Sequence, residues 1–207
     1  LMGSHLHGGR RGHLVKSRAR HNQVLYNRLD DHPDGQASYE LEFPNGGLAW
    51  VVGNLIVQSN RSENLTLLAF GAEGRAAEER RPHGLFLAHN TFVNAGLKPA
   101  LFVRVHEQIL GAPVAQRSVN NLFVGLGLAD LAEGGVAQGN FSVPQALLHA
   151  TTLGEWRVPA GAWLHGRAVP AGVAQGVPLQ PVAEFAAPLG IKPLAPRTVW
   201  SPGAFQD

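Results

Sequence analysis

The sequence predicts a right-handed parallel β-helix of about five coils, followed by an irregular C-terminal tail rich in proline and glycine. An Asn flanked by apolar residues recurs along the chain, and strand-like segments of period two lie between the recurrences. The 207 residues include 25 Gly and 14 Pro, and only 15% are charged, which argues against long helices with charged surfaces. Together these observations favour stacked coils of short parallel strands.

The recurring Asn marks a corner of each coil. Four segments carry it, VLYNRL, VVGNLIV, LAHNTFV and SVNNLFV, and their residues are Asn27, Asn54, Asn90 and Asn121. We place Ser4 at the same position of an earlier coil. Asn tolerates left-handed backbone and bonds to neighbouring backbone groups, so one buried Asn per coil predicts a tight corner between two short strands.

A second set of strands is expected at residues 14–19, 38–43, 64–70 and 100–106, where successive side chains would alternate between two faces of a sheet with period two. We expect one face to carry Val15, Ser17, Ala19, Tyr39, Leu41, Phe43, Leu65, Leu67, Ala69, Leu101, Val103 and Val105. The other face would carry Lys16, Arg18, Glu40, Glu42, Arg104 and His106. An antiparallel sandwich is the alternative, but it would need hairpin turns of about two to five residues rather than a fixed Asn corner.

We divide the chain into a β-helix domain at 1–169 and an extended tail at 170–207 that packs on the helix. Half of the prolines fall in this tail, which can therefore be neither helix nor central strand. The start of the chain has no charged-then-apolar leader, so we expect a signal peptide to be absent or removed. We also expect native coils or a capping helix before Leu1. No apolar run reaches the ~18 residues of a membrane span, and the absence of Cys excludes disulfides.

The charge is strongly asymmetric along the chain. Residues 1–28 hold six basic residues and no acidic one, whereas the rest holds eleven basic and fifteen acidic residues, so the two parts carry +6 and −4. Such a basic patch suits an anionic partner, either nucleic acid or an acidic polysaccharide. Single-stranded nucleic acid grooves interleave basic residues with aromatic ones, and Tyr26 is the only aromatic residue here. We therefore expect an acidic polysaccharide and no nucleic acid.

The segment from Gly12 to Gln58, GHLVKSRARHNQVLYNRLDDHPDGQASYELEFPNGGLAWVVGNLIVQ, resembles bacterial right-handed parallel β-helix repeat proteins of the pectate-lyase-like superfamily. The segment EWRVPAGAWLHGRAVPAG and the final PGAFQD resemble the ending of secreted β-helix proteins. This resemblance implies an extracellular or periplasmic location, and we expect a monomer. A narrower similarity, on Lys16-Ser17, is to alginate lyase and chondroitinase B-like polysaccharide lyases. It implies that Lys16 is a base, assisted by an Arg of a following coil, with calcium-binding carboxylates nearby.

The sequence therefore predicts a lyase that cleaves a uronate-containing polysaccharide by β-elimination. This reaction needs a base and a cation that neutralises the uronate carboxylate, and Lys16 and Arg18 supply both if neighbouring cations lower the pKa of Lys16. His13 is the alternative base. The expected pairs are Lys16 with Glu40 and Arg18 with Glu42, each 24 residues apart. The predicted substrate-binding residues are Arg20, Asn22, Glu40, Glu42, Asn45 and Glu73.

Two alternatives stay open. The first is a non-catalytic β-helix that binds polysaccharide or serves as a cell-surface structural module, in which the same charges form surface ion pairs. The second concerns the loop DDHPDG, in which Asp30, Asp31 and Asp34 offer oxygen ligands for calcium or form only an acidic turn. No metal ligand is assigned, because the histidines at 5, 7, 21 and 32 have no zinc spacing.

Overall fold

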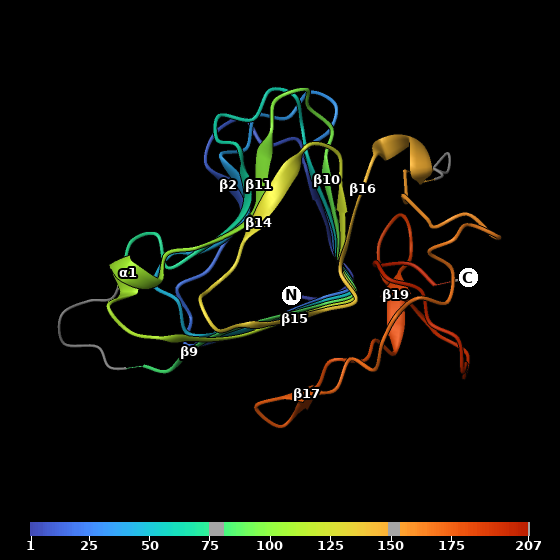
Figure 1. Ribbon diagram of the computed structural model, residues 1–207. Coiled ribbons are helices and arrows are strands. Elements are labelled where there is room, and N and C mark those ends of the chain that lie inside the picture. The colour runs from blue at the N-terminus through green and yellow to red at the C-terminus, as the bar shows by residue number, and fades with distance from the viewer. Residues whose placement is uncertain (75–80, 149–153, 207) are drawn as a thin grey trace.

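The computed structural model describes residues 1–74, 81–148 and 154–206. The protein is built almost entirely of short β-strands, which stack in three parallel sheets (Figure 1). Each coil contributes one strand to every sheet, so strand neighbours within a sheet are separated in sequence by a whole coil. The chain is therefore a parallel β-helix, as the Asn repeat and the period-two segments predict.

We call the three parallel sheets I, II and III. Sheet I contains β1 (His5–His7), β4 (Arg28–Asp30), β7 (Leu55–Gln58), β10 (Thr91–Asn94), β13 (Leu122–Val124) and β16 (Phe141–Val143). Sheet II contains β2 (His13–Lys16), β5 (Tyr39–Phe43), β8 (Thr66–Phe70), β11 (Ala100–Val105) and β14 (Gly127–Asp130). Sheet III contains β3 (His21–Leu25), β6 (Leu48–Val52), β9 (His83–Ala88), β12 (Val114–Val119) and β15 (Val136–Gln138).

Strands β2 to β16 make up five successive coils, each passing from sheet II to sheet III to sheet I. The loops that lead from sheet I to sheet II form one lobe, at the top of Figure 1. The described parts of the connections from sheet II to sheet III form a second lobe, which includes the short helix α1 (Glu107–Leu110). Sheet II therefore lies between two loop lobes, whereas sheets III and I meet at a tight corner.

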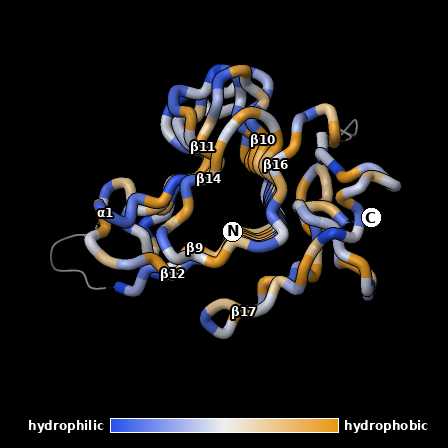
Figure 2. Tube along the Cα trace, viewed as in Figure 1, coloured by the Kyte–Doolittle hydropathy of each residue, from blue (hydrophilic) through white to orange (hydrophobic). Residues whose placement is uncertain are grey.

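The interior is formed by apolar side chains that stack from coil to coil. In sheet I, strand register places Leu29, Ile56, Phe92 and Phe123 in one column, and each is at most 5% exposed. The rings of Phe92 and Phe123 stack with centroids 5.5 Å apart. Figure 2 shows apolar residues repeating in register along the stack from β10 to β16. Burial of such columns, at about 25 cal/mol per Å² of apolar surface, stabilises the coils against one another.

The corner between sheets III and I is held by a ladder of Asn side chains. Each of the first four Asn residues donates an Nδ2 hydrogen to the Oδ1 atom of the next coil's Asn, at 2.9 to 3.0 Å, and that Oδ1 also accepts the backbone N–H of the same donor residue. The ladder consists of Asn27, Asn54, Asn90, Asn121 and Asn140. Ser4 begins it, because its backbone N–H donates to Asn27. The predicted corner is confirmed, and Asn140 is a member that the sequence analysis missed.

Two expectations about the strands of sheet II are wrong. The strand expected at 14–19 ends at Lys16, because Ser17 and Asn22 begin a turn with a hydrogen bond of 2.6 Å between their side chains. The second concerns β8: Leu67 was expected on the same face as Leu41, but the residue in register with Leu41 is Leu68, so the alternation is shifted by one residue. The segment LTLLAF is apolar at almost every position, so alternation could not identify its face.

The C-terminal tail contains two small antiparallel hairpins, β17 (Val173–Ala174) with β18 (Val177–Pro178), and β19 (Ala183–Phe185) with β20 (Ile191–Pro193). The tail packs on sheets I and III: the indole N–H of Trp50 donates to the carbonyl of Ala174, and the backbone N–H of Ala204 donates to Thr91. Figure 1 shows it beside β10 and β16, on the far side of the helix from β2, β11 and β14. Within the described segments, no helix is long and apolar enough to cross a membrane.

Candidate functional site

Sheet II carries a row of charged residues along the helix axis. Strand register places Lys16, Glu42, Ala69, Arg104 and Asp130 side by side on five successive strands. Neighbouring strands lie ~4.8 Å apart, so the backbones of Lys16 and Arg104, three strands apart, are separated by about 14 Å. The row thus brings charged residues from four of the five coils to one face that the tail leaves uncovered.

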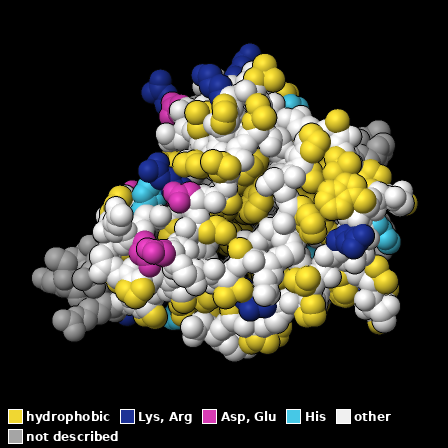
Figure 3. Space-filling view, viewed as in Figure 1, with side chains coloured by type: hydrophobic (Ala, Val, Ile, Leu, Met, Phe, Trp, Pro, Cys, Tyr) yellow, Lys and Arg dark blue, Asp and Glu magenta, His cyan; other side chains and the backbone are white. Residues whose placement is uncertain are grey.

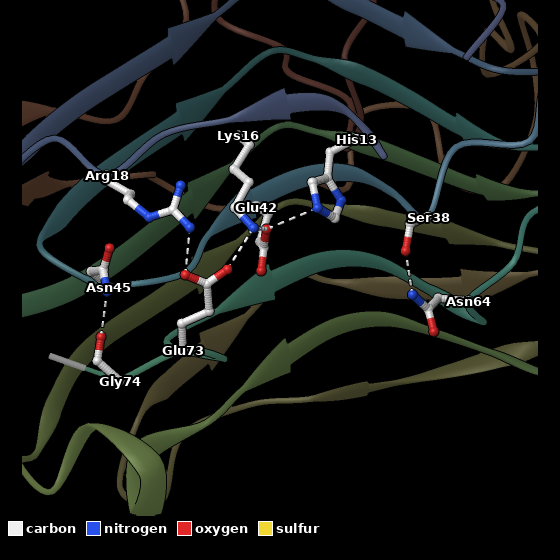
Figure 4. Close-up of polar contacts among 9 residues, drawn as sticks. All are labelled: His13, Lys16, Arg18, Ser38, Glu42, Asn45, Asn64, Glu73 and Gly74. Carbon is white, nitrogen blue, oxygen red and sulfur yellow. Dashed lines mark hydrogen bonds and ion pairs between the residues drawn. The ribbon is translucent and has the colours of Figure 1, made fainter. Parts of the chain in front are cut away.

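At one end of the row, four residues of the predicted site meet. The ammonium group of Lys16 lies 2.9 Å from Glu42 Oε2 and 2.6 Å from Glu73 Oε1. The guanidinium of Arg18 donates to the other oxygen of Glu73, so this carboxylate bridges two cations (Figure 4). Glu42 is 3% exposed and Glu73 is 42% exposed, so one carboxylate supports Lys16 from below and the other faces solvent.

The electrostatics of Lys16 differ from the expectation. The hydrogen bond to Glu73 raises the pKa of Lys16 above its ordinary value, and the contact with Glu42 acts in the same direction. The sequence analysis required a lowered pKa, caused by the neighbouring cations Arg18 and Arg20. Because the carboxylates dominate, Lys16 stays protonated near neutral pH and acts as a fixed positive charge rather than as a base.

His13 lies next to this group. Its Nε2 atom is 3.3 Å from Glu42 Oε2, and its ring stacks on Tyr39 with centroids 5.1 Å apart. Burial lowers the pKa of His13, so the imidazole is mostly neutral near pH 7. Its Nδ1 atom is buried and has no hydrogen-bond partner among the described residues. His13 therefore contacts Glu42 through Nε2, and its other ring nitrogen is buried.

Glu40 does not belong to the site, although it was predicted there. It is fully buried, and Gln58 and Ser62 donate to its carboxylate at 3.5 Å. The expected pairs, Lys16 with Glu40 and Arg18 with Glu42, are both wrong. The register between β2 and β5 is 26 residues rather than 24, so Lys16 faces Glu42.

The remaining predicted residues lie in or beside turns, and most of them form hydrogen bonds that stabilise these turns. Asn22 is 7% exposed and donates to the carbonyl of Ala19, which closes the turn between β2 and β3. Asn45 donates to the carbonyl of Gly74 and so joins the turns of two coils. Arg20 is exposed at the start of β3, where its carbonyl accepts the N–H of Leu48. Only Glu73 of the expected column with Asn22 and Asn45 contacts Lys16.

A second part of the face was not selected from the sequence. Arg104 and His106 line a cavity of about 400 Å³ between sheet II and α1, together with Asp130. His106 is fixed at both backbone ends, since its N–H donates to Phe70 and its carbonyl accepts the N–H of Leu110. Burial lowers the pKa of His106, and the neighbouring Arg104 lowers it further. Basic, acidic and histidine side chains gather on this flank in Figure 3.

Three basic residues of the N-terminal part, Arg10, Arg11 and Arg28, and the acidic loop are separate from this face. Asp30 pairs with Arg28, Asp31 accepts backbone N–H groups of Gly9 and Ala37, and Asp34 lies 3.5 Å from Arg61. The three carboxylates of DDHPDG thus have different partners. Among the described residues, no group of three or more His, Asp or Glu side chains could hold a metal ion. A cavity of about 800 Å³ beside this loop is lined by exposed Arg10 and Arg11.

Comparison with known proteins gives no match to any family, to any curated protein or to any solved structure.

Proposed function

We propose that the protein binds a linear uronate polysaccharide along sheet II and cleaves it by β-elimination. The observation that carries this proposal is a pair of cationic groups along one uncovered sheet, Lys16 with Arg18 at one end and Arg104 beside His106 three strands away. The proposal also includes an extracellular or periplasmic location and places the protein with pectate-lyase-like β-helix proteins.

The repeat of the face suits a linear acidic polymer. Its cations Lys16 and Arg104 are three strands apart, and each step between strands is ~4.8 Å, which is close to the length of one sugar ring. A polymer that lies along the helix axis would place one uronate carboxylate near Lys16 and Arg18 and another near Arg104. The two loop lobes beside sheet II would hold the polymer in this direction (Figure 1).

His106 and Arg104 fit the chemistry of the reaction. A neutral imidazole can take the proton from the sugar carbon that bears the carboxylate, and burial and Arg104, which both lower the pKa of His106, keep its ring neutral. Arg104 would neutralise the carboxylate while negative charge develops on it. The electron pair of the broken C–H bond forms a carbon–carbon double bond in the ring. The glycosidic oxygen on the next carbon then leaves with the second chain and takes up a proton from water.

The alternative is a module that binds the polymer without cleaving it. One observation favours it: Lys16, the base implied by the resemblance, is held by two carboxylates and stays protonated. On that alternative His106 has no catalytic role, and the row of charges alone binds the polymer. The two functions share a binding face and differ in whether a new double bond appears.

The test combines a cleavage assay with a binding assay. Alginate, pectate and glycosaminoglycans are incubated with the full chain, and the ultraviolet absorbance of the unsaturated uronate product is followed. We expect turnover of at least one polymer, its loss in His106→Gln, and retained binding of that variant in calorimetry. Arg104→Gln should weaken polymer binding, and Arg61→Gln is its control, since both remove one exposed cation.

Each outcome has a defined meaning. Binding without product would reject the lyase and support the binding module. Equal turnover by His106→Gln and the unchanged protein would reject His106 as the base. The absence of binding to every uronate polymer, or tighter binding of single-stranded DNA of equal charge, would reject the carbohydrate function.

A further inference from the structure

The carboxylate of Glu73 lies where the side chains of Lys16 and Arg18 converge. Each cation contacts a different oxygen of this one carboxylate, and all three side chains are partly exposed, at 26% for Lys16, 56% for Arg18 and 42% for Glu73 (Figure 4). Two cations that share the two oxygens of one carboxylate form the contacts that an anionic sugar would also make. The protein thus carries its own carboxylate at this point.

Glu73 and Glu42 contact the same ammonium group and differ in how they are held. Glu42 belongs to strand β5, is 3% exposed and also lies beside His13, so it cannot leave without disturbing the sheet. Glu73 belongs to a turn, where its backbone N–H donates to Pro44 at 2.9 Å. Its side chain can therefore rotate into solvent while the backbone stays in place.

The local charge depends on this rotation. With Glu73 in place, Lys16 and Arg18 are balanced by Glu42 and Glu73, and the four charges sum to zero. When the carboxylate of Glu73 leaves, the remaining three charges sum to +1. The guanidinium of Arg81 adds to this field, since it donates to the carbonyl of Arg18 at 3.1 Å. A carboxylate from outside would meet a net positive site.

We propose that Lys16 and Arg18 form a carboxylate-binding subsite that Glu73 fills in the free protein and that a uronate carboxylate of the ligand takes over. The inference rests on the proposed function, because it names the contact by which the polymer is held at this end of the row. Glu73 then acts as an internal competitor: it keeps the two cations oriented, lowers the affinity for weak anions and gives way to a polymer bound at several positions.

Removal of the competitor should strengthen binding. In Glu73→Gln the ligand no longer has to displace a carboxylate from the two cations. Because the displaced ion pairs are exposed and stabilise the free protein only weakly, the variant is expected to bind a short oligouronate only about two- to fivefold more tightly. The gain should disappear in the double variant Lys16→Ala with Glu73→Gln, because the subsite has then lost one of its cations. Asp34→Asn is a matched control: it removes one negative charge and one exposed ion pair, with Arg61, outside this cluster.

The experiment measures two ligands on each protein. Calorimetry gives the affinity for an oligouronate, and NMR follows the side-chain signals of Lys16 and Arg18 during titration with monomeric glucuronate. We expect tighter oligouronate binding by Glu73→Gln than by Asp34→Asn, and saturable glucuronate shifts at both cations in Glu73→Gln. Amide spectra of each variant verify the native fold.

Three results would overturn the inference. The first is equal or weaker oligouronate binding by Glu73→Gln. The second is a gain of the same size in Asp34→Asn, which would assign it to net charge. The third is the absence of glucuronate shifts at Lys16 and Arg18 in Glu73→Gln. If the unchanged protein binds no uronate polymer but Glu73→Gln still binds glucuronate at these cations, the proposed function fails and the subsite stands.

Discussion

Replacement of Asn54 by Leu tests the ladder that holds the coils together. The Asn54 side chain accepts two hydrogen bonds from Asn27, one from its backbone N–H and one from its Nδ2, both at 2.9 Å. It donates to the carbonyl of Val24 at 2.8 Å and to Asn90 Oδ1 at 2.9 Å. All of these groups are buried, so no water replaces the lost partner.

The magnitude follows from the groups left without a partner. The Asn27 N–H and the Val24 carbonyl each lose a buried hydrogen bond, and a buried group left unsatisfied costs about 1–3 kcal/mol. We therefore expect Asn54→Leu to lower the free energy of unfolding by about 2–6 kcal/mol. At the end of the ladder, Asn140 is partly exposed and water can replace its side chain. Asn140→Leu should cost about 1 kcal/mol.

Urea unfolding followed by circular dichroism and by Trp fluorescence measures both variants. The midpoints should shift at unchanged slope, which gives the two differences in free energy directly. A loss below about 1 kcal/mol for Asn54→Leu, or an equal loss for Asn140→Leu, would refute the reasoning that the ladder satisfies otherwise buried groups.

Two predictions concern pH. Burial lowers the pKa of His89 to about 4, from 6.5, and the ring packs on Trp200 of the tail with centroids 5.9 Å apart. As pH drops, the unfolded chain protonates this histidine before the folded protein does, so the free energy of unfolding should fall between pH 6.5 and pH 4, by about 3 kcal/mol in total. In His89→Gln this pH-dependent loss should be smaller, as measured by urea unfolding at several pH values. An unchanged pH profile in His89→Gln would contradict this. Burial raises the pKa of Glu40 well above its ordinary value of 4.5, so the folded protein keeps a proton that the unfolded chain releases, and stability falls as pH rises above 4.5. Glu40→Gln should therefore stabilise the protein at pH 7 more than at pH 4, by thermal unfolding at both, and an equal effect at the two pH values would count against a buried protonated Glu40.

The β-helix could be predicted from the sequence because its strongest determinant is local. An Asn corner needs one residue type at one position per coil, and that position is visible as an Asn between apolar residues. Asn140 was not recognised in the sequence because Gly139 and Ser142 interrupt the apolar pattern around it. Its segment GNFSV nevertheless aligns with NNLFV around Asn121, with the corner Asn at the second position of both. A search that allowed one small residue on each side would have found it.

The register between strands could not be predicted in the same way. The chain from β2 to β5 includes a turn of unknown geometry, and a shift of two residues replaces Glu40 by Glu42 opposite Lys16. Alternation does not detect this shift, because both residues have the same parity. Only the hydrogen-bond register shows that Glu40 lies among buried polar groups.

The site was predicted in part for a similar reason. Lys16, Arg18 and Glu73 were selected as separate residues, and the structure brings their charges together. The pKa of Lys16 depends on Glu73, which lies 57 residues away and reaches it from the turn after β8. Arg104 lies in β11 and His106 directly follows this strand. Both were expected on an outward face, and no motif distinguished them from a solvated face. Their cavity depends on α1, which the sequence analysis did not predict.

The most direct test of the polysaccharide-binding face is an NMR titration of the isotope-labelled protein with a hexauronate. We predict that the largest shifts fall on sheet II, at Lys16, Arg18, Arg104 and His106, and that the amides of the tail and of the loop with Arg10 and Arg11 change little. Shifts confined to that loop or to the tail, or none at saturating ligand, would contradict the claim that sheet II binds an acidic polysaccharide.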